Sequence, residues 1–392
     1  MYTCNMEDSH KREINSMSGI PEGQLPFRYL GIAINAKKMN KEDCQCLVDK
    51  VVSRLRTWGS RSLSYAGRAV LVNAVLLNLH SYWASIFILP KKVIDEVIAV
   101  CRNYLWDGKA VSSKSPMIAW DIICRPKKHG GLGFKESHAW NLAMVGKYIW
   151  NIATKADNMW VKWIDHVYMK GRDIWTYRAS SNASWYWNQL CKVKDKLATG
   201  FRNGNWVVNG YSAKVAYHWI RGAGLEINWC GWVWNRLNIP KHSFLAWIFQ
   251  WGRLNTRDRL IQHGMQVPSL CPLCEQENES HIHVFNDCKY ADQVWQSICS
   301  LLLIPHPKSQ PIGEWIKGVQ LTGFKRKVMY VHVVSVLYHI WQQRNKAIWE
   351  GIMIHPQKLS EKIIQEAQAR IWGILPKKAS ISDQAWLRAL SN

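Results

Sequence analysis

Residues 271–288, CPLCEQENESHIHVFNDC, combine side chains that can bind a metal ion. Cys271 and Cys274 form a C-x2-C pair, whose spacing lets one tight turn direct two thiolates at one ion. Pro272 inside the pair suits such a turn. His283 and Cys288 complete the pattern C-x2-C-x8-H-x4-C. Zinc takes four tetrahedral sulfur and nitrogen ligands in structural sites, so the quartet predicts a closed zinc site that supports folding and leaves no position for catalytic water.

One position of the quartet has a rival, because His281 stands two residues before His283. We favour His283, since it leaves a four-residue return to Cys288 and directly precedes the apolar Val284 and Phe285, which can anchor it. The alternative to a metal site is a set of buried free cysteines beside a surface histidine. Known metal-ligand spacings favour the zinc site over this alternative.

The carboxylates of the chain do not form the pairs that metal-dependent synthesis requires. Polymerases and nucleases of the two-metal type need at least two acidic residues that converge on magnesium. The sequence contains no Asp-Asp dipeptide, and it has no P-loop, G-x-S-x-G elbow or H-E-x-x-H motif. The GGLG run at 130–133 lacks the strand–helix setting of a nucleotide fingerprint and is typical of a turn. These residues favour a binding or structural module over an enzyme.

The positive charge of the chain is spread along its whole length. The 392 residues carry a formal net charge of +23, with an excess of +9 in residues 1–150, +6 in residues 151–300 and +8 in residues 301–392. A distributed excess is expected for a protein that follows a long polyanion, whereas a basic arm would concentrate it at one end. An ordinary basic protein without a nucleic-acid partner is the alternative that charge alone leaves open.

The numbers of cysteine and tryptophan residues indicate the compartment and the kind of core that the protein has. The 11 cysteines are odd in number and, outside the quartet, scattered, which together with a metal site indicates a reducing compartment. The 24 tryptophans most simply fill the core of a helical domain, although tryptophan can also stack on unpaired bases. The uncharged run 69–90 is interrupted by polar residues, so we expect a buried helix and no membrane span, and the N-terminus has no signal peptide.

Apolar spacing predicts a mainly α fold. Helical periodicity covers 42–58, where Leu47, Val51 and Leu55 share one face, and further helices are expected at 65–79, 92–106 and up to residue 153 after a basic glycine-rich loop at 125–134. Residues 154–203 look irregular and tryptophan-rich. The chain then becomes helical at 204–251 and carries helices at 328–341 and 358–373.

Six segments follow one another in a fixed order along the chain. They are LPFRYLG (25–31), RSLSYAGRAVLVNAVL (61–76), YLWDG (104–108), IAWDIICRPKKHGGLGF (118–134), IPKHSFLAWIFQWGRLNTRDRL (239–260) and CPLC…HVFNDC (271–288). This order resembles the C-terminal half of a plant LINE-type (non-LTR) retrotransposon reverse transcriptase with its zinc-binding domain, and the resemblance covers residues 15–300 approximately. The segment VLYHIWQQRNKAIW (336–349) also resembles the region after the zinc knuckle in that family.

The resemblance implies a domain order. Residues 1–35 would be the end of the palm with a primer-grip-like segment, and 36–153 a helical thumb-like and connection region. Residues 154–203 would be an irregular linker, 204–300 the reverse-transcriptase zinc-binding domain, and 301–392 a helical C-terminal tail. Cys271, Cys274, His283 and Cys288 match the zinc ligands of the family, and Phe27, Tyr29, Leu30 and Gly31 match the segment that holds the primer end.

The chain also departs from the family pattern. The fingers and the palm, with the catalytic aspartates of the F/Y-x-D-D motif, are expected before residue 25, and an RNase H domain is not recognisable after the knuckle. The sequence therefore predicts a nuclear, non-catalytic remnant that binds RNA–DNA hybrid or DNA without sequence preference, with no membrane and no small-molecule substrate. The candidate phosphate contacts are Arg54, Arg56, Arg61, Arg68, Lys127 and Lys128.

Two other functions remain open from the sequence. One is a zinc-stabilised protein-interaction module without a nucleic-acid role. The other is a part of an RNA-directed DNA polymerase that is active only with a separate palm polypeptide.

Overall fold

The fold is mainly α, as the sequence predicts. The computed structural model describes residues 7–19, 27–29, 32–34, 39–58, 63–202, 210–307, 310–375 and 379–390. Within these ranges, the strands β1 (Phe27–Tyr29) and β2 (Ile32–Ile34) pair antiparallel, with Phe27 opposite Ile34.

The chain divides into two compact units, each of which is described by itself. The first comprises Met1–Ser62, Ala69–Lys114 and Lys135–Ala223, and the second comprises Leu63–Arg68, Ser115–Phe134 and Gly224–Asn392. The domain boundaries inferred from the sequence remain predictions. None of the described helices is both long and apolar enough to cross a membrane.

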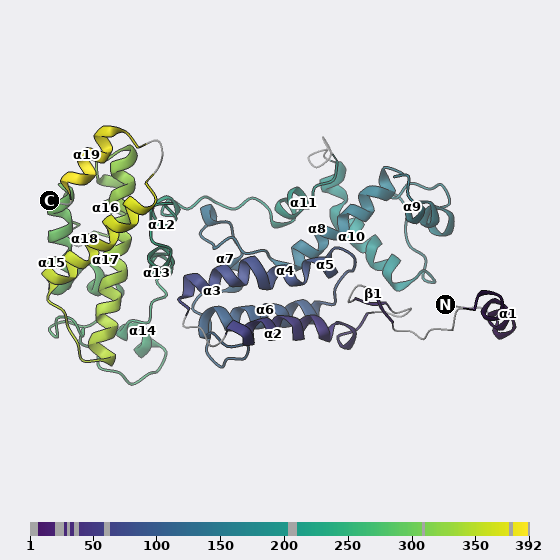
Figure 1. Cartoon of the computed structure of the whole chain (residues 1–392), viewed down its shortest axis with the longest axis horizontal. Helices are drawn as coiled ribbons and strands as arrows, with labels where there is room; N and C mark the ends of the chain where they lie inside the picture. Colours follow the sequence, from purple (N-terminus) through teal and green to yellow (C-terminus); the bar gives the residue numbers. More distant parts are fainter. Residues whose placement is uncertain are drawn as a thin grey trace. The chain divides into compact units, whose positions relative to one another are not determined.

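In the first unit, α2 (Gln45–Trp58) packs against α6 (Lys91–Asp107), and the two helices run side by side (Figure 1). Leu47, Val51 and Leu55 of α2 are buried, as their spacing predicts. Helix α6 ends at Gly108, whose backbone has φ 77°, a left-handed conformation that glycine adopts without steric cost. The helix predicted at 92–106 is therefore confirmed, with one more residue at each end.

The segment 154–203, which the sequence led us to expect as irregular, contains two α-helices. They are α9 (Met159–Ile164), which a π-helical turn Asp165–Met169 continues, and α10 (Trp185–Arg202). Trp187, Leu190 and Leu197 of α10 are buried in the core. Lys194 occupies a core position between them, where its Nζ donates to the carbonyl oxygen of Tyr177 at 2.7 Å. A lysine in the apolar stripe hides the helical period of α10, and this explains the error.

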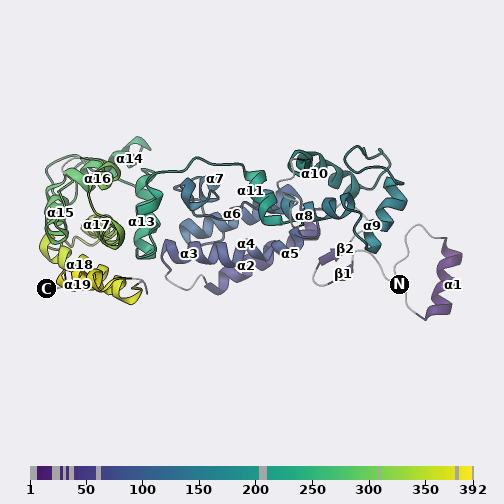
Figure 2. The ribbon, with the colours of Figure 1, turned by 90° about the horizontal axis from the view of Figure 1, so that it is seen from above.

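In the second unit, α13 (Pro240–Gln250), α15 (Lys289–Leu302), α17 (Gly323–Trp349) and α18 (Pro356–Gly373) form a helical bundle. Figure 1 and Figure 2 both show α17 and α18 side by side. The helices predicted at 328–341 and 358–373 are present, and α17 is longer than expected. The other α-helices of the part of the chain that the structure describes are α1 (Asp8–Ser18), α3 (Tyr65–Leu71), α4 (Leu77–Leu79), α5 (Ser81–Ala84), α7 (Trp120–Ile123), α8 (Ser137–Ala153), α11 (Ala213–Arg221), α12 (Cys230–Val233), α14 (Arg257–Gln262), α16 (Ile312–Gly318) and α19 (Ile381–Ala389).

The glycine-rich stretch 125–134 forms a turn, as the sequence predicts, and the turn packs against α13. A short 3-10 helix, Lys127–His129, ends at Gly130, which has φ 81°. The carbonyl oxygen of Gly130 accepts hydrogen bonds from Nε1 of Trp247 at 2.7 Å and of Trp251 at 3.0 Å. A Cβ at Gly130 would meet Cδ1 of Ile227 at 2.7 Å, so both the backbone conformation and the close packing favour glycine here.

Candidate metal centre

A tight loop presents the first two cysteines of the quartet. An isolated antiparallel bridge pairs Leu270 with Asn278 and closes the base of the loop. Above this bridge, the amide of Cys271 donates to the carbonyl of Glu277 at 2.7 Å, and the amide of Glu275 donates to the carbonyl of Cys271 at 2.8 Å. Glu275 has φ 54°, which is uncommon for a residue other than glycine. The bridge and the turn hold Cys271 and Cys274 on the same side of the loop.

A helical segment presents the other two ligands. His283 begins a π-helical turn, His283–Asp287, and Cys288 stands immediately before α15, where its amide donates to the carbonyl of His283 at 2.8 Å. Val284 and Phe285 are fully buried, so they anchor this turn in the core as the sequence argument expects. The carbonyl of Phe285 accepts a hydrogen bond from Nε1 of Trp295 at 2.8 Å.

The four side chains converge. One ligand atom from each of Cys271, Cys274, His283 and Cys288 lies within 4.8 Å of the others. The Sγ atoms of Cys271 and Cys288 are 3.9 Å apart, and Sγ of Cys274 is 3.4 Å from Nε2 of His283. Tetrahedral zinc with bonds of roughly 2.3 Å to sulfur and 2.0 Å to nitrogen separates its ligand atoms by about 3.5–3.8 Å. The distances therefore suit a tetrahedral metal ion.

The surroundings of the quartet also suit a closed site. Cys271 and Cys288 are fully buried and His283 is buried. The hydrogen bond between the two thiols lowers the pKa of Cys271 and raises the pKa of Cys288, so without a metal ion it favours one thiolate shared by the pair. A thiolate is the form that binds metal. Four protein ligands complete a tetrahedral shell, so the geometry serves structure and offers no position for a reacting water.

His281 takes no part in the quartet. Its ring stacks on Phe249 with centroids 4.5 Å apart, and it also contacts Phe285. Burial lowers the pKa of His281, so the ring stays neutral near pH 7. The structure thus brings His283, the residue favoured from the sequence, to the metal-binding position.

Two glutamates behind the ligands were not identified from the sequence. Oε2 of Glu277 lies 3.2 Å from Nδ1 of His283, on the side of the ring that faces away from Cys274. A carboxylate in this position orients a metal-bound histidine and increases its basicity. The role of Glu277 could be recognised from the sequence only if the path of the loop back toward His283 were known.

Glu279 connects the loop that carries Cys271 and Cys274, here called the metal loop, to α17. Its side chain is fully buried, and its two oxygens accept hydrogen bonds from Nε and Nη2 of Arg344 at 2.8 and 2.9 Å. Nε of Arg257 lies 3.6 Å from the same carboxylate. The amide of Glu279 donates to the carbonyl of Ser269 at 2.7 Å, next to the cysteine pair. A buried, bidentate ion pair therefore ties the loop to the C-terminal tail.

A second group of potential metal ligands, His242, His339 and Glu366, joins α13, α17 and α18. Nε2 of His339 lies 2.7 Å from Oε2 of Glu366, and Nζ of Lys241 lies 2.8 Å from Oε1 of the same carboxylate. Because a lysine and a histidine already contact both oxygens, this group is a hydrogen-bonded ionic network that fastens three helices together.

The candidate phosphate contacts fall in both units. Arg54 and Arg56 are exposed on α2 in the first unit. In the second unit, Nζ of Lys127 lies 4.8 Å from the ring centroid of Trp234, and Lys128 forms an exposed ion pair with Glu226 at 3.2 Å. The charge of Lys128 is thus partly compensated.

The other candidates differ in their surroundings. Arg68 is half-buried, with its guanidinium 5.4 Å from the ring centroid of Tyr65. Phe27 and Tyr29 of the primer-grip-like segment lie in β1. Arg61, Leu30 and Gly31 lie outside the described residues.

Comparison with known proteins agrees with the geometry of the site. A family described as zinc-binding in reverse transcriptase matches residues 211–295, which include the whole quartet. An Arabidopsis thaliana protein, provisionally named as a ribonuclease H protein, is 30% identical over 135 residues, or 34% of this chain. The chain spans 22% of the length of that relative. Residues 211–295 are therefore similar to the zinc-binding domain of reverse transcriptases, and the part from residue 224 onward, in the second unit, carries a Cys3His cluster able to hold a metal ion.

Proposed function

We propose that this chain is a remnant of a plant LINE-type reverse transcriptase that binds nucleic acid, is stabilised by a structural zinc ion, and does not itself synthesise DNA. The proposal rests mainly on the agreement between the family match and the geometry of the four ligands. The residues that match the reverse-transcriptase zinc-binding family include four ligand atoms that lie within 4.8 Å of one another.

The donor set is the reason to propose zinc. Three thiolates and one imidazole form a soft ligand set that suits zinc and disfavours magnesium or calcium, which prefer oxygen. The four ligands come from two separate parts of the chain, so a bound ion closes the loop 271–274 onto the start of α15. Its role is to stabilise this part of the fold.

The positive charge of the chain and its similarity to the zinc-binding domain of reverse transcriptases support nucleic acid as the partner. The net charge is +23, and the exposed Arg54, Arg56 and Lys127 offer cations to phosphate groups. Contacts of this kind bind the backbone without reading the sequence. RNA–DNA hybrid or DNA is the proposed ligand, and the nucleus is the compartment where such a ligand would be met.

The absence of paired aspartates from the sequence supports a role without catalysis. The ribonuclease H name of the Arabidopsis relative concerns a protein of which this chain covers 22%, and we do not include that activity in the proposal.

Salt dependence tests the proposed binding. Fluorescence anisotropy with a labelled RNA–DNA hybrid should show that affinity falls about tenfold or more between 50 and 200 mM NaCl, because binding releases counterions from the phosphates. Replacement of Arg54 and Arg56 by Gln should lower the slope of log affinity against log salt by about 2 if both residues contact phosphates.

A matched control is Lys162→Gln in the same unit, because the ammonium of Lys162 already pairs with Asp157 at 2.6 Å. This variant should leave the slope unchanged. An affinity for the hybrid that does not change with salt would contradict the proposal.

A further inference from the structure

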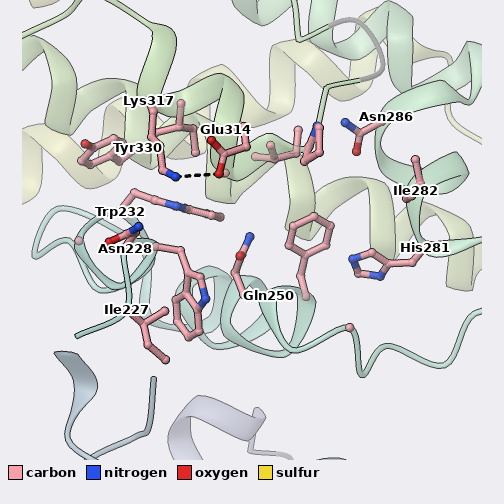
Figure 3. Close-up of a pocket in the computed structure, with 18 of the residues that line it drawn as sticks. Ile227, Asn228, Trp232, Gln250, His281, Ile282, Asn286, Glu314, Lys317 and Tyr330 are labelled. Atoms are coloured by element: carbon pink, nitrogen blue, oxygen red, sulfur yellow. Dashed lines mark hydrogen bonds and ion pairs between the residues drawn. The ribbon is translucent and has the colours of Figure 1, made fainter. Parts of the chain in front are cut away.

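The second unit contains a cavity of about 680 Å³ beside the metal-binding segment (Figure 3). Its walls come from the loop before α12, the end of α13, residues 281–286, and the helices α16 and α17. The volume falls within the roughly 300–1,000 Å³ typical of small-ligand sites. The cavity is separate from the quartet, yet one of its walls is the segment that carries His283.

Flat apolar surfaces dominate the lining of the cavity. Trp229, Trp232, Phe249 and Tyr330 contribute aromatic rings from three parts of the unit. Trp232 and Phe249 are buried and therefore held by packing, whereas Trp229 and Tyr330 are half-buried. Rings of this kind stack on flat partners, and each unpaired nucleobase has such a face.

Polar groups that lack partners lie among these rings. Nε1 of Trp232, Nδ1 of His281 and Nε of Arg326 are buried and have no hydrogen-bond partner within the described residues. All three side chains line the cavity. These three nitrogens expose almost no surface, so they belong to the packed wall behind the cavity. Trp232 is 3% exposed, so packing holds its ring in place.

Amide side chains add hydrogen-bonding capacity at the edge of the cavity. Asn228 and Gln250 line it, and Figure 3 shows both side chains beside Trp232. An amide can donate and accept, as the edge of a nucleobase does. The acidic side chain of Glu314 is already paired with Lys317 at 2.7 Å, which leaves Arg326 as a cation able to attract a phosphate.

We propose that this cavity binds an unpaired nucleobase of a single-stranded nucleic acid, stacked on the aromatic wall and hydrogen-bonded by the amides of Asn228 and Gln250. The inference rests on the proposed nucleic-acid-binding function and adds a contact to bases, which the backbone contacts of Arg54 and Arg56 do not provide. The metal centre then has a second role, since it fixes the segment that carries His281.

The test compares two RNA eight-mers of equal charge, of which one carries its bases and the other is abasic throughout. Anisotropy with the full-length chain at 100 mM NaCl should show that the intact strand binds about tenfold or more tightly than the abasic strand. Tyr330→Ala should bring the two affinities close together, because it removes part of the stacking surface. Tyr330→Phe keeps the ring and should preserve the difference.

Trp349→Ala is the control for the loss of an aromatic ring, because Trp349 is 80% exposed and lies outside the cavity. It should leave both affinities unchanged. The salt slope for the RNA–DNA hybrid should be the same in Tyr330→Ala as in the original chain, which shows that the variant is folded.

Each other outcome has a distinct meaning. Equal affinity for the intact and abasic strands, with salt-dependent binding retained, would overturn the base site and leave the proposed function standing. Loss of binding to every nucleic acid in the original chain would overturn both. Binding of free uridine monophosphate as tightly as the intact strand would replace the single strand by a free nucleotide as the ligand and contradict the inference.

Discussion

At the scale of single residues, we expect a carboxylate beside a metal ligand to support metal binding. Glu277 lies 3.2 Å from Nδ1 of His283 and is itself exposed. Glu277→Gln should weaken metal binding about 10- to 100-fold, because the histidine loses the group that orients it and raises its basicity. Competition with a chromophoric chelator measures this affinity.

Glu275→Gln is the control for this prediction, because Glu275 is an exposed glutamate in the same loop but is not placed beside a ligand. An affinity of Glu277→Gln equal to that of Glu275→Gln would show that the carboxylate has no role at the site.

A buried histidine should make the first unit sensitive to acid. His80 is 2% exposed, neither of its ring nitrogens has a partner within the described residues, and burial lowers its pKa from 6.5 to about 4. The folded state therefore disfavours protonation of His80. The stability that the neutral ring contributes is fully present above pH 6.5 and is lost as the pH falls toward 4. Between pH 7 and pH 5 the loss should be about 2 kcal/mol. Hydrogen exchange of α6 measures it, and His80→Leu should abolish this part of the dependence.

The sequence predicted the four ligands because their spacing is a local property, and it favoured His283 because apolar neighbours come directly after it. The structure places all four together. The roles of Glu277 and Glu279 were not predictable, because they depend on a loop that turns back toward His283 and on a helix 65 residues further along the chain.

At the scale of elements, the ion pair of Glu279 with Arg344 links the metal loop to α17. Arg344→Met should lower the free energy of unfolding of this unit by about 3–5 kcal/mol, because it leaves a buried carboxylate without its partner. Urea denaturation measures the change. Lys346→Met on the same helix is the control and should change stability by less than about 0.5 kcal/mol.

The double variant Glu279→Leu with Arg344→Met provides a second test of this link. It should recover part of the lost stability, since the fully buried carboxylate is gone and Arg257, whose side chain is 16% exposed, is, among the described residues, the one cation that loses its acidic partner. Additive losses in the two single variants and the double variant would mean that the two side chains act independently.

Element prediction succeeded where the apolar period is uninterrupted, as in α2 and α6. It failed at α10, because the buried Lys194 stands in the apolar stripe, where Nζ donates to the carbonyl oxygen of Tyr177 and pairs with Asp195 at 3.0 Å. The tail was recognised as helical, but its packing against α13 and α15 depends on contacts between distant residues, which local spacing does not contain.

At the scale of the whole molecule, positive charge is a property of both compact units. The excess is +9 in residues 1–150 and +8 in residues 301–392, so neither end of the chain carries it alone. Charge counts along the sequence predicted this distribution, and apolar spacing predicted the mainly α fold. The division into units composed of non-contiguous segments could not be predicted, because residues 115–134 join a unit whose other members lie mostly beyond residue 223.

The central claim is that Cys271, Cys274, His283 and Cys288 hold a zinc ion on which this part of the fold depends. The most direct measurement is the zinc content of the purified full-length chain, by elemental analysis, beside Cys271→Ser and the control Cys299→Ser, which alters a buried cysteine of α15 outside the quartet. We expect one equivalent of zinc in the original chain and in Cys299→Ser, and its loss in Cys271→Ser with unfolding around residues 204–300. One full equivalent retained by Cys271→Ser would contradict the account.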